Sequence, residues 1–470
     1  MLSPIQTRRQ FLGTTALGSI ATASLSSRTA SAGELADAKD DGYRGIWFTL
    51  GQPSEHGDKY SGGLGTYTAN HVPMAIYSKA ADKSFFVYGG AKQGRRHLLA
   101  MASYFDHKRG VVPRPTIVHD KEGVDDPHDN PSLVLDGDGH VWVFISGRGR
   151  TRPGYIYRST QPHSTDAFER VAEREFTYPQ PWWVDGRGFI FLFTKYTSGR
   201  ELYFSTSEDG RLWSPDVKFA GIGGHYQTSQ LRDGRLITAF NRHPRGNVDR
   251  RTDLYLLQTE DLGRTWRDVR GEQVSVPLEA PASTALVHDY SAEKRLVYIH
   301  DLDLDGAGRP VILLTTSAGH QPGPSGDPRW WTLARWLGGH WDLREITPAN
   351  HNYSTGSLHL ASEGPWRIIG PAERGPQPLG SGGEVALWSS ADAGQTWKKE
   401  RDVTQASTMN HNYVRRVQHA HPDFTAFWAD GNPDAFSPSN LYFTNAEGVK
   451  VWQLPYEMNA DFAEPKLFAS

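Results

Sequence analysis

The sequence predicts an all-β fold, a β-propeller of seven four-stranded blades, on three observations. The 470 residues include 48 glycines and 15 tryptophans, which suit tight turns and the packing between twisted sheets. Short strand-like runs are separated by Gly, Asp, Asn or Pro, and no long helical period follows residue 35. A turn motif also recurs after three of these runs.

The recurring motif is S/T-x-D-x-G-x-T-W, which occurs at 259–266 and 390–397, with a shortened copy at 207–213. We expect the Asp to accept backbone N–H bonds across a hairpin turn, the Gly to take a positive φ and the Trp to pack into the blade. The motif resembles the Asp-box of sialidase-like propellers. It is a folding device, and we give it no catalytic role.

Further strands are expected at 85–87, 98–103, 141–146, 155–158, 189–194, 236–241, 296–300, 311–316, 330–335, 425–428, 441–444 and 449–454. Blades of roughly 60 residues each would fill the chain with six or seven copies, and we expect seven. The alternative is two stacked β-sandwich domains. No linker of low complexity divides the chain in that way.

The composition excludes several classes of protein. The chain has no Cys, so it has neither a disulfide framework nor a Cys-ligated metal nor a thiol nucleophile. The net charge of −3 argues against a nucleic-acid-binding protein. No stretch approaches the ~20 apolar residues of a membrane span, so we expect no membrane association in the exported chain. We also expect a monomer.

The first 32 residues have the pattern of a twin-arginine signal peptide. Thr7-Arg8-Arg9-Gln10-Phe11-Leu12 opens a mild apolar run, and Ala30-Ser31-Ala32 is a small-residue cleavage site. The alternative is a frayed amphipathic terminus. We therefore expect a signal peptide at 1–32, one propeller domain at 33–470 and a periplasmic or secreted protein. Loss of the three arginines in the leader would take the net charge to about −6.

Four segments carry more polar functional groups than turns require. They are 59–73, 125–131 with 146–153, 223–227 with 241–252, and the Asn-His-Asn-Tyr doublet at 350–353 and 410–413 with Arg415, Arg416, His419 and His421. Each has a structural alternative, because Asp-Asn-Pro runs make turns by themselves and Asn-His-Asn-Tyr can close blades through its amides. In a propeller, however, strand ends from several blades converge on one mouth of the central channel.

A site rich in Arg, His and Tyr suits an anionic sugar. Arginine binds a carboxylate through two parallel hydrogen bonds, and His and Tyr can move protons. These residue types suit β-elimination from a uronic acid. The carboxylate is neutralised, a base removes the proton on the neighbouring ring carbon, and an acid protonates the departing glycosidic oxygen.

Several longer motifs resemble one known family. They are Gly42-Tyr43-Arg44-Gly45-Ile46-Trp47, the glycine segment 59–67, His71-Val72-Pro73, 85–90, His128-Asp129-Asn130-Pro131, His225-Tyr226-Gln227, 248–252 and His421-Pro422-Asp423-Phe424. Together they look like the fourth BNR-repeat family of seven-bladed propellers, which includes ulvan lyases and rhamnose–glucuronate lyases. The resemblance covers roughly 40–460.

The resemblance implies that His128 and Tyr226 act as the acid and the base, in either order. Arg242 fits the spacing of the arginine that neutralises the uronate, and His71 matches a catalytic histidine of the rhamnose–glucuronate branch. Arg148 stands where a second family histidine is expected. It can bind a carboxylate but cannot be a general base. We expect Asn130, His225 and Arg250 to bind substrate. The departure at Arg148 argues against ulvan itself.

No cofactor is required by this chemistry. Members of the group can carry a structural calcium or zinc, for which His411, His419, His421 and Asp423 offer ligands, although the metal is unknown and their alternative is hydrogen bonding within a blade. The expected partner is an anionic, uronate-containing glycan. Two other functions stay open. One is a glycoside hydrolase, sialidase-like or a rhamnosidase, using carboxylates among Asp125, Asp126, Asp129 and Asp249, and the other is a propeller that binds glycans without cleaving them.

Overall fold

The computed structural model describes residues 35–64, 70–92 and 95–469. The predicted signal peptide and residues 65–67 of the glycine segment lie outside them. The described residues form β-strands with four short 3-10 turns, η1 (Pro127–Asp129), η2 (Pro244–Gly246), η3 (Val248–Arg250) and η4 (Pro324–Gly326). They contain no helix long and apolar enough to cross a membrane. The prediction of an all-β fold is confirmed.

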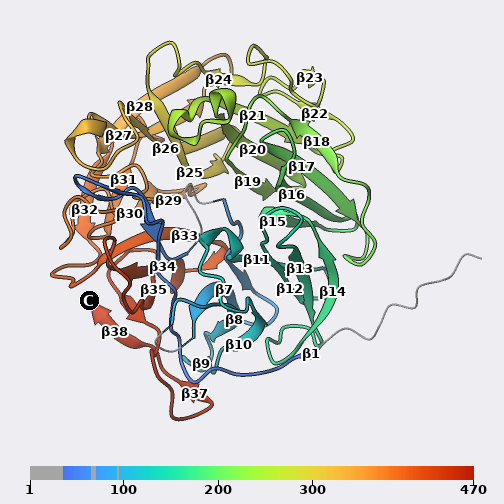
Figure 1. Ribbon diagram of the computed structural model, residues 1–470, viewed down its shortest axis with the longest axis vertical. Coiled ribbons are helices and arrows are strands. Elements are labelled where there is room, and N and C mark those ends of the chain that lie inside the picture. The colour runs from blue at the N-terminus through green and yellow to red at the C-terminus, as the bar shows by residue number, and fades with distance from the viewer. Residues whose placement is uncertain (1–34, 65–69, 93–94, 470) are drawn as a thin grey trace, which may run out of the picture. The chain divides into compact units, whose positions relative to one another are not determined.

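Successive segments of the chain fold into antiparallel sheets (Figure 1). One sheet is β11 (Pro131–Leu135), β12 (Val141–Ile145), β13 (Gly154–Ser159) and β14 (Phe168–Arg174), with β1 (Leu35–Ala36) at its edge. The next is β15 (Thr177–Val184), β16 (Gly188–Tyr196), β17 (Arg200–Ser207) and β18 (Val217–Ala220). It is followed by β19 (Gln227–Arg232), β20 (Arg235–Arg242), β21 (Thr252–Thr259), β22 (Trp266–Arg267), β23 (Gln273–Val274) and β24 (Leu286–His288).

Two further four-stranded sheets follow. They are β25 (Leu296–Leu304), β26 (Pro310–Ser317), β27 (Arg329–Trp336) and β28 (Trp341–Pro348), and then β29 (Ser357–His359), β30 (Trp366–Gly370), β31 (Ala386–Ser390) and β32 (Lys398–Asp402). Three two-stranded ribbons pair β2 (Phe48–Thr49) with β5 (Ser61–Gly62), β3 (Pro53–Ser54) with β4 (Gly57–Asp58), and β9 (Val112–Pro113) with β37 (Phe462–Ala463).

The remaining sheet joins the two ends of the described chain. Its first group is β6 (Ala75–Ser78), β7 (Lys83–Ala91), β8 (Leu98–Asp106) and β10 (Thr116–Asp120), and its second is β33 (Asn410–His421), β34 (Phe424–Gly431), β35 (Leu441–Thr444), β36 (Val451–Gln453) and β38 (Lys466–Ala469). One parallel pairing, Gln418 with Ile76, connects β33 to β6.

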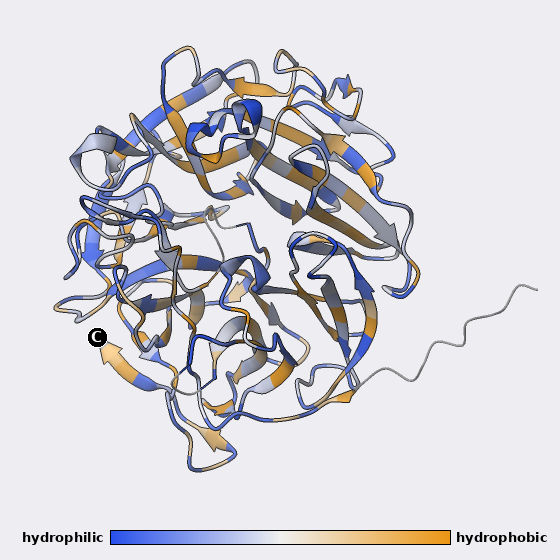
Figure 2. Cartoon of the chain, viewed as in Figure 1, coloured by the Kyte–Doolittle hydropathy of each residue, from blue (hydrophilic) through white to orange (hydrophobic). Residues whose placement is uncertain are grey.

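The first strands of these groups form a closed ring. β6, β11, β15, β19, β25, β29 and β33 each contact the next, and β33 contacts β6 (Figure 1). Apolar residues from neighbouring sheets fill the spaces between them, and apolar stretches along these strands are visible in Figure 2. Between the β15 and β19 sheets, for example, the rings of Phe219 and Trp266 stack with centroids 5.1 Å apart. The starts of the first strands therefore gather at one mouth of the ring and their ends at the other.

The repeated turn motif is held by its aspartate. The Asp261 carboxylate accepts from the Thr265 N–H at 2.9 Å and from the Thr265 hydroxyl at 2.6 Å. Gly263 has a φ of +80°, and a Cβ there would lie 2.4 Å from the Phe204 ring. The Trp266 side chain is buried against that ring. These hydrogen bonds to its ionised form lower the pKa of Asp261.

Several histidines are buried in the strands that form the ring. Burial lowers the pKa of His300 and His359 to about 3 and that of His225, two residues before β19, to about 4. His300 bonds the Thr315 hydroxyl at 2.8 Å, and His359 bonds the Ser357 hydroxyl at 2.9 Å. These side chains are therefore neutral inside the folded protein at pH 7.

We predict that Asp261→Ala lowers the free energy of unfolding by about 1–3 kcal/mol, because Thr265 loses its acceptor. Urea denaturation measures the change. The exposed neighbour Glu260, changed to Ala, is the matched control and should shift stability by less than about 0.5 kcal/mol. Equal stability of Asp261→Ala and the control would contradict this role for the carboxylate.

We also predict that stability is complete above about pH 6.5 and falls as the pH drops toward 4. The unfolded chain protonates these histidines near their ordinary pKa of 6.5, whereas the folded chain does so only at about 3 or 4. Acid therefore favours the unfolded state. Thermal melts at constant ionic strength measure the slope, which His300→Gln should reduce. A melting temperature that is flat from pH 7 to pH 4.5 would argue against buried neutral histidines.

Candidate functional site

Tyrosines from neighbouring sheets gather at the mouth where the first strands begin. Tyr178 lies at the start of β15 and Tyr226 directly precedes β19, and their ring centroids are 5.6 Å apart. Tyr298 in β25 and Tyr353, just before β29, are 5.2 Å apart. All four side chains are buried. They bring phenol groups from four consecutive sheets to one place.

A single arginine lies among these rings. The Arg251 guanidinium carbon is 4.4 Å from the Tyr298 centroid, 4.9 Å from Tyr226 and 5.3 Å from Tyr353. Its Nη2 donates to the Tyr353 hydroxyl at 2.9 Å and its Nε to the Val248 carbonyl at 3.0 Å. The side chain is 1% exposed, so its charge is stabilised by ring faces and these acceptors instead of by water.

His128 is positioned by the short turn η1. Asp126 caps this turn, accepts from the His128 N–H at 3.0 Å and contacts the ring Nδ1. This contact places the imidazole proton on Nδ1 and the lone pair on Nε2. The Asp126 carboxylate also binds Arg148 at 2.9 Å and Arg152 at 2.6 Å. Burial lowers the pKa of His128, so its neutral form can accept a proton near neutral pH.

Tyr178 connects the histidines to Tyr226. Its ring centroid lies 5.4 Å from His128 and 5.7 Å from His71. His71 Nε2 donates to the His128 carbonyl at 3.1 Å, and burial lowers the pKa of His71 to about 3. Tyr178 has a φ of +56°, a conformation that a bulky residue rarely adopts.

Two arginines line a cavity of about 430 Å³ beside these residues. Arg148 and Arg200 form its walls together with Gly149, Tyr196 and Gly199. The guanidinium carbons of Arg148 and Arg200 lie 6.0 Å and 5.6 Å from the Tyr196 ring, and Arg200 is also 6.0 Å from the Tyr226 ring. The cavity therefore offers two cations to an anionic ligand, next to a tyrosine and a histidine that can exchange protons.

The structure thus brings together four of the predicted site residues, His71, His128, Arg148 and Tyr226, around Tyr178. Arg242 is instead paired with a carboxylate. The Arg242 guanidinium binds the Asp253 carboxylate through Nε and Nη2, both at 2.8 Å. Its neighbour on β20, Asn241, is the residue that contacts Tyr226, accepting from the Tyr226 N–H at 3.0 Å.

The other predicted substrate-binding residues either form hydrogen bonds to backbone groups of the fold or are exposed to solvent. Both ring nitrogens of His225 are engaged, with the Asn241 carbonyl at 2.8 Å and the Ile222 N–H at 2.9 Å. Asn130 is buried and donates to the Gly63 carbonyl at 3.2 Å. Arg250 lies in η3 and is exposed.

Sequence reasoning did not assign Tyr178, Arg200, Arg251 or Tyr353 to the site. Arg251 and Tyr353 fall inside segments that were singled out as rich in polar groups, so the signal for them was present. Tyr178 and Arg200 begin strands β15 and β17, and nothing in their local sequence distinguishes them from other strand-starting residues.

The carboxylates considered for hydrolysis are paired with cations. Asp129 is fully buried and binds Lys121 at 2.7 Å and Arg152 at 2.8 Å. Asp249 binds Lys59, and Asp125 lies 3.8 Å from Arg96. Asp126 is bound by His128 and two arginines, and its pKa is lowered, so it stays ionised. A protonated general acid is therefore not provided by Asp126.

A cluster of metal-ligand type lies away from this mouth. His107, His421 and Asp423 each offer one ligand atom, and these atoms are within 4.8 Å of one another. His107 Nε2 bonds the Ser84 hydroxyl at 2.8 Å, and its buried Nδ1 has no hydrogen-bond partner among the described residues. His411, at the start of the same strand β33, instead accepts from the Trp428 indole N–H at 3.0 Å.

Comparisons with known proteins agree with this architecture. An ulvan lyase from Nonlabens ulvanivorans is 23% identical over 337 residues, which cover 63% of this chain and 69% of the relative. An ulvan lyase from Alteromonas sp. (strain LOR) is 20% identical over 355 residues, 66% of this chain and 70% of the relative.

Solved structures show the same fold. The structure of an ulvan lyase of the polysaccharide lyase family PL25 superposes with a TM-score of 0.69 at 16% identity, over 87% of this chain and 96% of that one. A structure of a PL25 ulvan lyase bound to -[GlcA(1-4)Rha3S]- superposes with the same TM-score, identity and coverage. The polysaccharide lyase Uly1 gives a TM-score of 0.60 at 13% identity, over 88% and 99% of the two chains.

A family model described as BNR repeat-containing family member matches residues 100–349, more than half of the sequence. These residues run from β8 through the β25 sheet and include His128, Arg148, Tyr178, Arg200, Tyr226 and Arg251. The chain belongs to the BNR repeat-containing family.

Proposed function

We propose that this protein is a polysaccharide lyase that cleaves a uronate-containing glycan by β-elimination. The observation that carries the proposal is the contact of His128, Tyr178 and Tyr226 beside the cavity lined by Arg148 and Arg200. The similarity to ulvan lyases supports it. The substrate we propose contains glucuronate linked to rhamnose, the sugar pair bound in the related PL25 structure.

In the proposed reaction Arg148 and Arg200 bind the uronate carboxylate. Neutralisation of this carboxylate acidifies the proton on the neighbouring ring carbon. A base removes that proton, a double bond forms in the ring, and the bond from the ring to the glycosidic oxygen breaks. The leaving oxygen takes a proton from an acid. His128 and Tyr226 are the residues we assign to these proton transfers, and His71 supports His128 through its backbone carbonyl.

The blade number belongs to the same proposal. The sheet that joins β6 to β33 counts as two blades, one beginning at β6 and one at β33. Together with the sheets that begin at β11, β15, β19, β25 and β29, this gives seven blades, the number we propose. The recurrent aspartate turns support its assignment to the Asp-box propellers. We further propose a monomer that is exported by the twin-arginine route to the periplasm or the medium.

For the metal we propose zinc at His107, His421 and Asp423. Two imidazoles and a carboxylate suit Zn²⁺ better than Ca²⁺, which prefers oxygen ligands. The buried Nδ1 of His107 supports this assignment. The cluster lies directly after β8 and at the β33–β34 turn, so the ion would link two strand groups and take no part in elimination.

Incubation with ulvan, gum arabic and related uronic polymers should release a product with the ultraviolet absorbance of an unsaturated uronate. We predict that Tyr226→Phe and His128→Ala each lower kcat by about 10²–10⁴. Initial rates at saturating polymer measure the loss. A product with a saturated terminal sugar would indicate a hydrolase, and glycan binding without turnover by the unmodified protein would indicate a binding propeller.

Substitution of single arginines distinguishes Arg200 from Arg242 as the residue that binds the substrate carboxylate. We predict that Arg200→Gln lowers kcat/KM by about 100-fold or more, because Arg200 lines the cavity that would bind the carboxylate. Arg242→Gln is the matched control and should change kcat/KM only a few-fold, because its guanidinium is bound to Asp253. The opposite ranking would place the carboxylate at Arg242 and not in the Arg148–Arg200 cavity.

For the metal, titration calorimetry of the metal-free protein should show one Zn²⁺ bound per chain at pH 7, with His107→Ala binding at least tenfold more weakly. His56→Ala, which changes a histidine outside the cluster, should bind as the unmodified protein does. Equal affinity in both variants, or Ca²⁺ binding in preference to Zn²⁺, would rule out this site.

A further inference from the structure

The opposite mouth of the ring contains a larger cavity than the candidate active site. Its volume is about 980 Å³, and it is lined by the ends of all the first strands, from Tyr77 on β6 and Trp183 on β15 to Gln418 on β33. Tyr178 lies at the start of β15 and Asp185 directly follows its end, seven residues or about 23 Å away. The large cavity is therefore separate from the His128–Tyr226 site.

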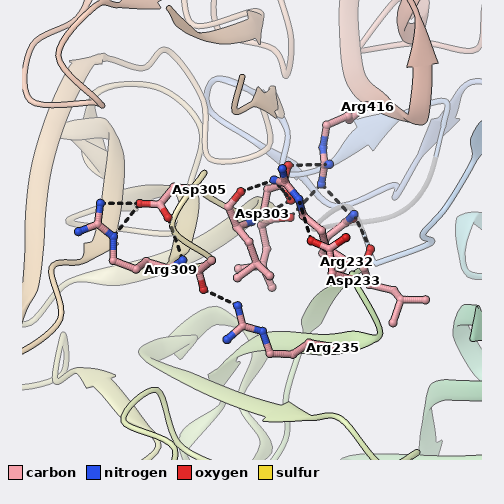
Figure 3. A network of polar contacts seen from close by, with 12 residues as sticks. Arg232, Asp233, Arg235, Asp303, Asp305, Arg309 and Arg416 are labelled. Atoms are coloured by element: carbon pink, nitrogen blue, oxygen red, sulfur yellow. Dashed lines mark hydrogen bonds and ion pairs between the residues drawn. The ribbon is translucent and has the colours of Figure 1, made fainter. Parts of the chain in front are cut away.

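A network of charged residues lines this cavity, and Figure 3 shows its members Arg232, Asp303 and Arg416. Arg416 binds Asp301 at 3.0 Å, Asp303 at 3.1 Å and the Gln230 side-chain oxygen at 3.1 Å. Arg232 lies beside Asp303 in the same network. Farther along the axis, the void next to Arg415 measures only about 20 Å³. A ligand in this cavity would therefore enter and leave by the opposite mouth.

Cations on the rim are not neutralised by carboxylates. Arg187 donates to the backbone carbonyls of Glu260 and Gly234, the latter at 3.2 Å, and Arg367 donates to the Ala446 carbonyl at 3.2 Å. Within the described parts of the chain, no carboxylate is within ion-pair distance of either guanidinium. Arg187 is exposed and Arg367 is partly exposed, so both keep their charge available to a ligand.

The remaining rim residues are of the kind that binds sugars. The half-buried Trp183 lines the cavity, and its indole N–H donates to Asp185 at 3.0 Å. Tryptophan is a side chain that can stack on the apolar face of a sugar. His419 is exposed and has a φ of +54°, at an irregularity in the pairing of β33 with β34. Besides Asp303, the acids that line the cavity are Asp136, which accepts from the Trp142 indole N–H at 2.8 Å, Asp185, bound to Trp183, and Asp233, which faces Arg232.

We propose that this opposite mouth is a second, non-catalytic binding site for an anionic oligosaccharide. Arg187 and Arg367 would bind its carboxylate or sulfate groups, and a sugar ring would stack on Trp183. The volume is at the upper end of small-ligand sites and fits a few sugar units. The site would hold one stretch of a polymer while another reaches the catalytic mouth, which raises its effective concentration there. This consequence rests on the proposed lyase function, whereas the binding itself does not.

The test compares the double variant Arg187→Gln/Arg367→Gln with a matched pair outside the cavity, Arg267→Gln/Arg401→Gln, both exposed arginines. Native electrophoresis in gels that contain ulvan, polygalacturonate or dextran sulfate measures affinity from retardation. We expect the rim variant to bind at least one of these polymers about tenfold more weakly, and the control pair to bind as the unmodified protein does. Trp183→Ala, with its melting temperature measured in parallel, should give a similar loss without removing a charge.

Equal retardation of the unmodified protein and the rim variant on all three polymers would overturn the proposal. So would equal weakening in the control pair, which would indicate nonspecific attraction to surface charge. If a uronate polymer is cleaved, the rim variant should keep kcat/KM on a short oligosaccharide and raise KM about tenfold on the polymer. If none is cleaved, the lyase proposal fails, while the electrophoresis still decides the second site.

Discussion

The closure of the ring between β6 and β33 is the contact on which the rest of the structure depends. Those strands are more than 300 residues apart in the sequence, and one parallel pairing, Gln418 with Ile76, joins them. Because the ring closes, all the first strands run side by side around one axis. Residues at their starts, such as Tyr178 and Tyr226, then lie side by side at the mouth although no sequence motif links them.

The second constraint is the burial of charge at that mouth. Arg251 is surrounded by ring faces, and a guanidinium in such a position is stabilised only if aromatic groups and hydrogen-bond acceptors replace its water. The tyrosines therefore have a structural reason to be there besides any part in proton transfer. Asp126 does the corresponding task for His128, since it fixes both the turn and the position of the imidazole proton.

The all-β fold could be predicted from the sequence because the residues that indicate strands and turns act over short stretches of the chain. Turn residues such as Asp261 and Gly263 act within five residues, so their spacing is readable without the rest of the chain. Strand β15 was missed because Tyr178, Pro179 and Pro181 break the alternating pattern, and the site residues it carries were missed with it. His128 and Tyr226 were found by resemblance. The pairing of Arg242 with Asp253 could not be predicted, because it depends on how β20 and β21 present their side chains.

The position of β33 near the end of the chain has a consequence for the order of folding. Each sheet is built from neighbouring hairpins of low contact order, so its turns can form while the chain is still being synthesised. The β6–β33 contact has the highest sequence separation in the ring and can form only when residues beyond 410 are available. Until then the apolar faces of the first and last groups have no partner. A chain that stops before β33 would form an unclosed ring with two uncovered apolar faces. We expect such a chain to associate with other copies of itself.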